Sequence, residues 1–394
     1  MPMKKIMKWW YITQYFVFII IFAFANITAG NIDIGRLLIS SVLILTMLMG
    51  ASLTLLEKRL TKLILVFRWI EALFYLVVSS TIYSFLGQRL HSLPLVLVLA
   101  LYTLVTLLPV IYNLLSVFTP LVNRLLFSYI WFLWTPPMVA LTRQKLGNQF
   151  LQDLFSSGLW DALAYVIFAL FLMRQLGFGS CDWGPIKKLS VWTVSLIGLF
   201  VLYFSFLNAF SIDQNWLKAL FVFDFSDFKP TLPLTFAALR AGVGEEIVCR
   251  YIFLLSLLHF WRNHKYQVPL AIFISSALFG LIHFGNLIKG QDLVATTSQV
   301  IFATAVGIAF SVIYLYTGKL WTVILFHAII DLLAFSSSGS STMAAMSVGD
   351  LLTPQDVYLF LFSSLFSIWM LTGQRKRLIY ANVGQLFNPS NSKI

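Results

Sequence analysis

Charged side chains are scarce in this sequence of 394 residues. Asp, Glu, Lys and Arg make up 11% of the chain, whereas about 25% is usual in soluble domains. Hydrophobic residues make up 59%, and a water-soluble fold has too little interior to bury so much apolar surface. The composition therefore excludes a soluble globular protein and a disordered chain, and it predicts an integral membrane protein.

Cysteine is also scarce, since the chain contains only Cys181 and Cys249. Two cysteines do not form a disulfide scaffold, and neither has the spacing of a zinc–sulfur motif. The net charge of +12 would suit a nucleic-acid binder if the protein were soluble. In a membrane protein it is better explained by Lys and Arg in loops that face an anionic leaflet. We therefore expect no nucleic-acid partner.

Long apolar runs, in contrast, are numerous. A membrane-spanning helix needs about 20 apolar residues, and twelve runs approach this length. The first ends at Ala29, and the others lie at about 37–56, 63–86, 93–118, 125–142, 158–176, 189–210, 231–261, 267–285, 294–316, 320–337 and 356–372. The sequence thus predicts an all-α polytopic bundle of about twelve transmembrane helices. A re-entrant piece within 93–142, where prolines crowd, would lower this count by one or two.

Lys and Arg concentrate in alternate loops, which sets the orientation of such a bundle. If the basic residues at 4–8 are cytoplasmic, the clusters at 58–62 and 375–377 fall on the same side. One loop, at 143–145, disagrees. We therefore expect a multi-pass protein of the cell membrane with both termini in the cytoplasm.

Polar residues at membrane depth are unevenly distributed along the chain. Residues 1–210 form a hydrophobic N-terminal transmembrane region without a recognisable motif. Residues 231–337 hold most of the polar groups within predicted spans, and 338–394 contain a serine-rich loop, the last span and a polar tail. We expect any functional core to lie in 231–337.

Ionisable side chains inside a span are costly and therefore mark functional sites by default. Arg68 and Glu71 lie three residues apart on one helix face and can pair, so we interpret them as a structural ion pair. Glu246 and Arg250 lie four residues apart, and the arginine can neutralise the carboxylate. Glu245 points about 100° away. It has no partner on its own helix and can serve as a general base.

Two of the five histidines lie at membrane depth in neighbouring spans. The ring of Phe279, four residues before His283, can pack beneath that imidazole. Asp331, four residues after His327, can orient the second imidazole and fix its tautomer. Just before Glu245, the small residues at 242 and 244 allow another helix to approach closely.

Glu245, His283 and His327, with Asp331, are thus expected to converge from three helices. One interpretation is a metal site, in which Glu245 and the two histidines bind a divalent ion such as zinc and leave a position open for water. In the other, no metal is needed: Glu245 deprotonates a water molecule, while the histidines and Asp331 position it and stabilise the oxyanion. Both give peptide-bond hydrolysis inside the membrane, and the spacing is not that of the HExxH zinc motif.

At these residues the sequence resembles the CAAX-protease and bacteriocin-processing family of intramembrane peptidases, also called the Abi family. The family motifs EExxxR, FxxxH and HxxxN or HxxxD are matched, in this order, by Glu245, Glu246 and Arg250, by Phe279 and His283, and by His327 and Asp331. Each motif alone is common, but all three occur in order and in predicted spans. The resemblance covers about residues 231–337.

This resemblance implies an all-helical catalytic core in which Glu245 acts on water. It also implies that His283, His327 and Asp331 belong to the site and that Glu246 and Arg250 support it. Relatives act on prenylated proteins in eukaryotes, or on small peptides such as bacteriocins in bacteria, some conferring immunity. The sequence has no eukaryotic feature, so we expect a bacterial membrane protein.

Three functions remain to be compared. The first is an endopeptidase for a membrane-embedded or amphipathic peptide within the lipid bilayer. The second is a non-catalytic scaffold or bacteriocin-immunity protein with the same fold, although all the motif residues are present. The third is a transporter, which twelve spans would suit, although no repeat relates the two halves. The sequence identifies no protein partner.

Overall fold

The computed structural model describes residues 2–28, 34–56, 62–90, 92–133, 147–179, 181–186, 189–211, 215–341 and 353–386. These residues are almost entirely helical, and one isolated β-bridge joins Ser211 to Phe223. The all-α prediction is therefore confirmed. The chain divides into two compact units, Met1–Leu176 and Gly177–Ile394, which are described separately below.

Eight helices of the described chain are long and apolar enough to cross a membrane, and ten spans result if two bent helix pairs each count as one. The predicted count of about twelve is not confirmed. The expected span at 125–142 overlaps the 13-residue helix Leu121–Leu133, and residues 134–146 lie outside the described residues. The helical run from Leu232 to Phe260 is not among the eight, because it carries four charged residues and changes helix type.

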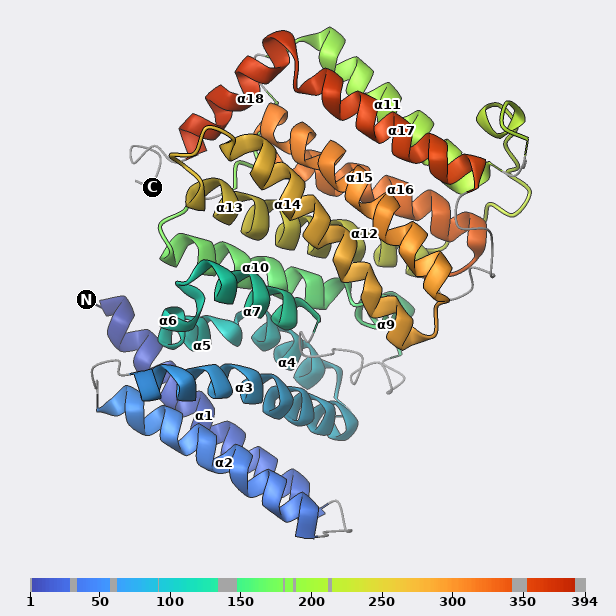
Figure 1. Ribbon diagram of the computed structural model, residues 1–394. Helices are drawn as coiled ribbons and strands as arrows, with labels where there is room; N and C mark the ends of the chain where they lie inside the picture. The colour runs from blue at the N-terminus through green and yellow to red at the C-terminus, as the bar shows by residue number, and fades with distance from the viewer. Residues whose placement is uncertain are drawn as a thin grey trace. The chain divides into compact units, whose positions relative to one another are not determined.

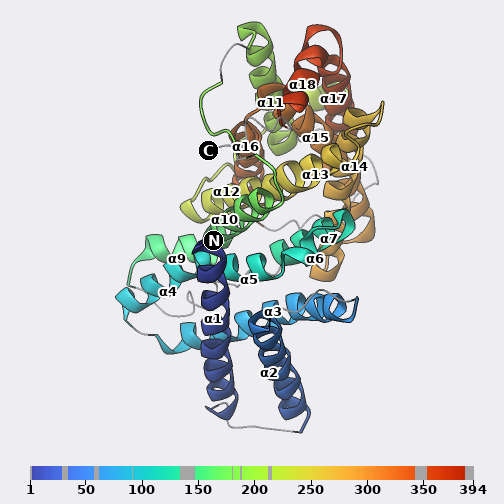
Figure 2. The same cartoon turned by 90° about the vertical axis from the view of Figure 1, so that its left-hand side faces the viewer.

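The first unit begins with three long helices joined by short connections, and shorter helices follow. The helices are α1 (Pro2–Thr28), α2 (Ile34–Leu55), α3 (Lys62–Arg89), α4 (Leu93–Val105), α5 (Leu107–Asn113), α6 (Leu115–Phe118), α7 (Leu121–Leu133), α9 (Gln149–Ser156) and α10 (Leu159–Gln175). Helices α1 and α2 lie side by side (Figures 1 and 2), and α1 also packs on α3 and α5. Proline favours the first turn of a helix, which suits Pro94 in α4 and Pro109 in α5.

The second unit contains α11 (Val191–Phe210), η1 (Lys218–Leu220), α12 (Leu232–Glu246), η2 (Ile247–Leu254), α13 (Leu255–Phe260), α14 (Gln267–Ile282), η3 (His283–Lys289), α15 (Leu293–Thr317), α16 (Leu320–Ser338), α17 (Pro354–Met370) and α18 (Gly373–Leu386). The most extensive packing joins α12 to α16 and α14 to α15. Helix α11, from the region 1–210, packs on α16 and α17 in this unit.

Two glycines bring helices of the second unit close together. A Cβ atom added at Gly242 of α12 would lie 2.7 Å from the backbone oxygen of Ile324 in α16, and one at Gly307 of α15 would lie 3.0 Å from Cβ of Ser276 in α14. Without a Cβ atom, the backbones approach directly. The predicted close approach at Gly242 is confirmed, and it brings the end of α12 against the middle of α16.

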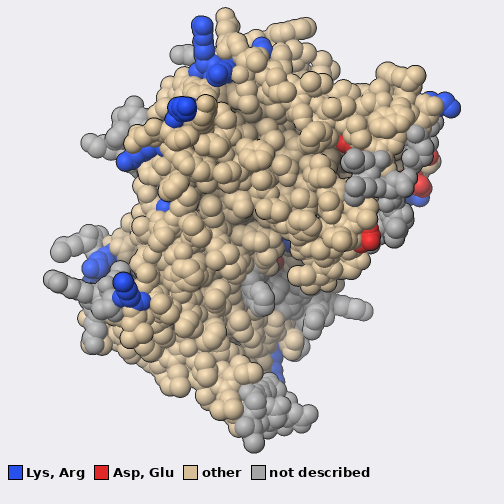
Figure 3. Space-filling view, viewed as in Figure 1, with Lys and Arg blue, Asp and Glu red and all other residues tan. Residues whose placement is uncertain are grey.

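The surface of the protein is largely without charge. Figure 3 shows few Lys, Arg, Asp or Glu side chains among the described residues on the face in view. Many large apolar side chains are exposed, among them Ile20, Leu45, Leu63 and Val98. Such a surface is stable in contact with lipid rather than water.

Both cysteines are free. Cys249 is buried, and Cys181 lies in the segment 181–186, outside the candidate spans. Burial raises the pKa of the Cys181 thiol to about 12, so this thiol stays protonated at neutral pH.

Candidate active site

The centre of the second unit is a buried ion pair at the junction of α12 and η2. After Glu246 the helix widens into the π-helix η2, and such segments are frequent at functional sites. Oε2 of Glu246 lies 3.0 Å from Nε of Arg250, and both residues are fully buried. The predicted pair is confirmed, and its opposite charges make burial tolerable.

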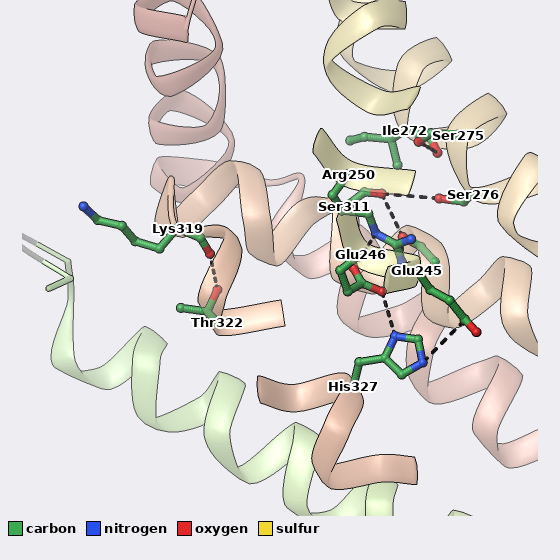
Figure 4. Close-up of polar contacts among 11 residues, drawn as sticks. Glu245, Glu246, Arg250, Ile272, Ser275, Ser276, Ser311, Lys319, Thr322 and His327 are labelled. Carbon is green, nitrogen blue, oxygen red and sulfur yellow. Dashed lines mark hydrogen bonds and ion pairs between the residues drawn. The ribbon is translucent and has the colours of Figure 1, made fainter. Parts of the chain in front are cut away.

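His327 of α16 extends this ion pair into a larger cluster. Its Nδ1 atom lies 2.8 Å from Oε1 of Glu246, within hydrogen-bond distance. On the other side of the ring, Nε2 lies 3.7 Å from Oε2 of Glu245 and 3.5 Å from Oδ2 of Asp331. Figure 4 shows both glutamates pointing toward this imidazole. Three carboxyl groups from two helices therefore surround one histidine.

The orientation of His327 differs from the sequence-based expectation. Asp331 was expected to orient this ring, but the closest contact is made by Glu246. Glu246 thus connects Arg250, through one oxygen, to His327, through the other. Spacing along one helix reveals only partners on that helix, so the contact between Glu246 and His327 has no signal in the sequence.

His283 lies where α14 ends and η3 begins, beside the cluster rather than inside it. Its Nδ1 atom is 3.0 Å from the carbonyl oxygen of Phe279. Because a carbonyl oxygen only accepts hydrogen bonds, Nδ1 carries the proton, and Nε2 of the neutral ring can accept one. Among the described residues, no hydrogen bond or ion pair joins His283 to Glu245, His327 or Asp331.

The ring of Phe279 packs against both histidines. Its centroid lies 5.2 Å from that of His283 and 6.0 Å from that of His327. The guanidinium carbon of Arg250 lies 4.8 Å from the Phe279 centroid and 5.7 Å from that of Phe310. Nη1 of Arg250 is buried with no hydrogen-bond acceptor in the described chain, so cation–π contact with the two rings compensates its charge.

Phe310 is a member of the site that the sequence did not reveal. Its ring centroid lies 5.7 Å from that of His327, and the side chain is buried. Nothing in the sequence distinguishes it from the other 36 phenylalanines, since the chain has 37. Phe310 and Phe279 keep water from the Glu246–Arg250 pair, which strengthens the attraction between the two charges.

Exposure divides the cluster into an inner and an outer part. The side chains of Glu246 and Arg250 are at most 1% exposed, whereas those of Glu245 and Asp331 are 23% and 17% exposed. The inner pair therefore holds His327 in place. The outer carboxyl groups are the ones that water or a substrate can reach.

The predicted metal ligands do not form a metal site in this arrangement. Within the described chain, no group of three or more His, Cys, Asp or Glu side chains is placed to hold a metal ion. Nδ1 of His327 is engaged by Glu246, so Nε2 is the ring nitrogen that faces Glu245 and Asp331. A zinc site needs about three protein ligands converging on one point, and the metal site formed by Glu245, His283 and His327 stays a prediction.

Comparison with known proteins identifies one segment. Residues 227–333 match the family model described as type II CAAX prenyl endopeptidase Rce1-like. This segment is about a quarter of the chain and contains every residue of the cluster described above. No curated protein and no solved structure matches the chain.

The match confirms the resemblance to the CAAX-protease and bacteriocin-processing family in this segment. The helical fold and the match together define a class of protein, that of multi-pass membrane proteins with an Rce1-like endopeptidase domain. They support an intramembrane protease in general.

Proposed function

We propose that this protein is an intramembrane endopeptidase that hydrolyses a peptide bond of a membrane-embedded or amphipathic peptide. One observation carries the proposal: within the Rce1-like segment, two partly exposed carboxyl groups meet at Nε2 of a histidine that a buried ion pair holds. A carboxylate beside an oriented imidazole is suited to proton transfer.

In the proposed reaction Glu245 takes a proton from a water molecule, and the water oxygen attacks the scissile carbonyl carbon. Nε2 of His283, when neutral, accepts a hydrogen bond from this water and positions it. His327, protonated on both nitrogens, donates through Nε2 to the developing oxyanion. Glu245 then gives its proton to the amide nitrogen as the C–N bond breaks, so the products are a carboxylic acid and an amine.

Asp331 and Glu246 act on His327 from opposite sides of its ring. Glu246 is a positioning residue, because it contacts Nδ1 and is fixed by Arg250. Asp331 lies near Nε2, on the other side of the ring from Glu246. The proposed mechanism requires no metal ion, since the described carboxyl and imidazole groups supply each proton transfer.

The biological roles of this activity follow from the resemblance and belong to the same proposal. Substrates are membrane-associated proteins or small peptides such as bacteriocins, and immunity to such peptides is one outcome of their cleavage. We also propose that the protein is bacterial and that both termini lie in the cytoplasm.

The test compares cells that make the wild-type chain with cells that make Glu245→Gln at equal membrane levels. Peptides of the membrane and the medium are profiled by mass spectrometry. Asp227→Asn is the matched control, since it also removes one carboxylate but at an exposed position outside the cluster. We expect a precursor to accumulate, and a shorter product to disappear, only with Glu245→Gln.

The same experiment separates the alternatives. If the peptide profiles are identical and Glu245→Gln retains any host phenotype, the protein is a scaffold or immunity protein without catalysis. A transporter would instead change the distribution of a peptide between membrane and medium without changing its length.

A further inference from the structure

The first unit contains a cavity of about 310 Å³ between α1, α2, α3, α5 and α6. This volume is at the lower end of the range of small-ligand sites. Its described lining includes three basic residues, Lys4 and Lys8 of α1 and Arg68 of α3, and no Asp or Glu. Thr54, Asn113 and Ser116 add polar groups. The cavity is therefore both basic and rich in hydrogen-bonding side chains.

Arg68 is fixed in the wall of this cavity. Its Nη1 atom donates to Glu71 at 2.7 Å and to the Tyr11 hydroxyl at 3.2 Å, and its Nη2 atom donates to Thr54 at 2.9 Å. Arg68 is only 6% exposed. In the described chain its hydrogen bonds involve Nη1 and Nη2, so Nε remains to serve a ligand. A fixed guanidinium is a strong binding group for phosphate.

The two lysines approach the cavity from the first turns of α1. Lys8 donates to the carbonyl oxygen of Leu55 at 3.3 Å, which ties it to the end of α2. Lys4 lies one turn earlier and is exposed. The start of α1 and the start of α3 lie at the same end of the unit (Figure 1). The basic groups thus gather where three consecutive long helices begin or end, as expected at a membrane surface.

Apolar side chains beside the cavity indicate what kind of anion it suits. Leu53, Ile64 and Leu115 line its wall. Around it, Ile6, Leu56 and Leu63 are 60%, 62% and 77% exposed and point away from the protein interior. A free anion would gain nothing from these side chains, whereas the acyl chains of a lipid would cover them.

We propose that this cavity binds the phosphate headgroup of an anionic phospholipid, with Arg68, Lys4 and Lys8 contacting the phosphate and the neighbouring aliphatic side chains contacting the acyl chains. Basic pockets between transmembrane helices are suited to such headgroups. This site lies in the first unit and does not depend on the proposed peptidase function.

The test uses the purified full-length protein in a neutral detergent. A short-chain phosphatidylglycerol, the matching phosphatidylcholine and inorganic phosphate are titrated separately, and binding is followed by native mass spectrometry and by the shift of the unfolding temperature. Lys4→Gln/Lys8→Gln removes two charges from the cavity. Lys5→Gln/Lys62→Gln removes two charges from the same end of the unit without altering the described lining.

We expect phosphatidylglycerol to bind and stabilise the wild type, and Lys4→Gln/Lys8→Gln to raise its dissociation constant by about tenfold or more, as loss of charge-assisted hydrogen bonds requires. The control pair should change it by less than about twofold. Equal weakening in both pairs, or equal binding of phosphatidylcholine, would overturn the proposal. Binding of inorganic phosphate as strong as that of the lipid would overturn the headgroup assignment.

Discussion

The described residues of each unit include a buried arginine–glutamate pair, and the two pairs have different surroundings. Arg68–Glu71 in the first unit is enclosed by neutral partners, since Tyr11 contacts both side chains and Thr54 accepts from the arginine. Glu246–Arg250 in the second unit is continued by a histidine and two further carboxyl groups. The first pair contacts no further titratable carboxyl or imidazole group among the described residues, whereas the second holds a histidine that two partly exposed carboxyl groups approach.

This difference shows how a buried ion pair serves structure or chemistry. An enclosed pair satisfies most of its charge internally and fixes helices, and it holds no further carboxyl or imidazole group for proton transfer. A pair that fixes a histidine places that ring for proton transfer. Only the inner residues are then fully removed from water. The five predictions below test this comparison in order of decreasing effect.

The largest effect is expected from Glu245→Gln in purified, reconstituted protein. Loss of the general base should lower the rate of peptide cleavage by about 10³-fold, within the range for such groups. The unfolding temperature should stay close to that of the wild type, because Glu245 is partly exposed. The corresponding change in the first unit, Glu71→Gln, should lower stability but leave the rate per folded molecule unchanged. An equal loss of rate in both variants would contradict the assignment of catalysis to the second unit alone.

A large loss of stability is expected from Arg250→Met. It leaves the Glu246 carboxylate buried without its cationic partner, which costs about 3–5 kcal/mol. Thermal unfolding in detergent measures the loss. The double variant Arg250→Met/Glu246→Gln should recover most of it, because no unpaired charge remains. A double variant less stable than Arg250→Met would show that the unpaired Glu246 carboxylate is not the cause of the lost stability.

Gly242→Ala should produce an intermediate effect through helix packing. The new Cβ atom would meet the backbone of α16, which cannot move as a side chain does. We expect a loss of about 1–3 kcal/mol, as for overpacking elsewhere, and a lower cleavage rate, because Glu245 and His327 are carried by these two helices. Gly198→Ala in α11 is the control, since nothing lies within 4 Å of its Cβ position. Similar losses in both variants would contradict this account.

A smaller effect is expected from Asp331→Asn. The substitution keeps the shape of the side chain and removes one of the two carboxylates near Nε2 of His327. Because Glu246 rather than Asp331 makes the closest contact with the ring, we expect about a tenfold loss of rate, less than for Glu245→Gln. Steady-state cleavage of a model peptide measures both variants. A loss from Asp331→Asn as large as that from Glu245→Gln would assign Asp331 the role of base.

No effect is expected from metal chelators. Incubation of the reconstituted protein with a strong zinc chelator, followed by its removal, should leave the cleavage rate within about twofold of the untreated protein. A matched sample with zinc added after chelation controls for damage. Loss of activity that zinc restores would favour the metal site over the proposed mechanism.

Contacts within one helix were accessible from the sequence. The spacing of Arg68 and Glu71, and that of Glu246 and Arg250, predicted two ion pairs that the structure contains. The scarcity of charge predicted a helical membrane protein, and three short motifs located the Rce1-like segment. These features depend on composition or on the fixed geometry of a helix, so a linear pattern reveals them.

The number of spans was not accessible in the same way. The run at 93–118 was read as one span, and α4 and α5 together, Leu93–Asn113, are long and apolar enough to cross a membrane. The next run, at 125–142, was also read as a full span, but the described residues there belong to the shorter helix α7. In the other unit, the run Leu232–Phe260 contains both a π-helix and the charged cluster. Helix breaks and changes of helix type depend on hydrogen bonds and packing that hydropathy does not record.

The sequence by itself determined that the protein is helical and membrane-embedded, which residues pair along each helix, and which segment carries the protease motifs. The tertiary structure decided that Glu246 holds His327, that Glu245 and Asp331 face the same ring nitrogen, and that Phe279 packs against both histidines. It also decided where the basic cavity forms. The physical reason is that helix periodicity fixes neighbours three or four residues apart. Contacts between helices depend instead on how closely their backbones approach, as at Gly242.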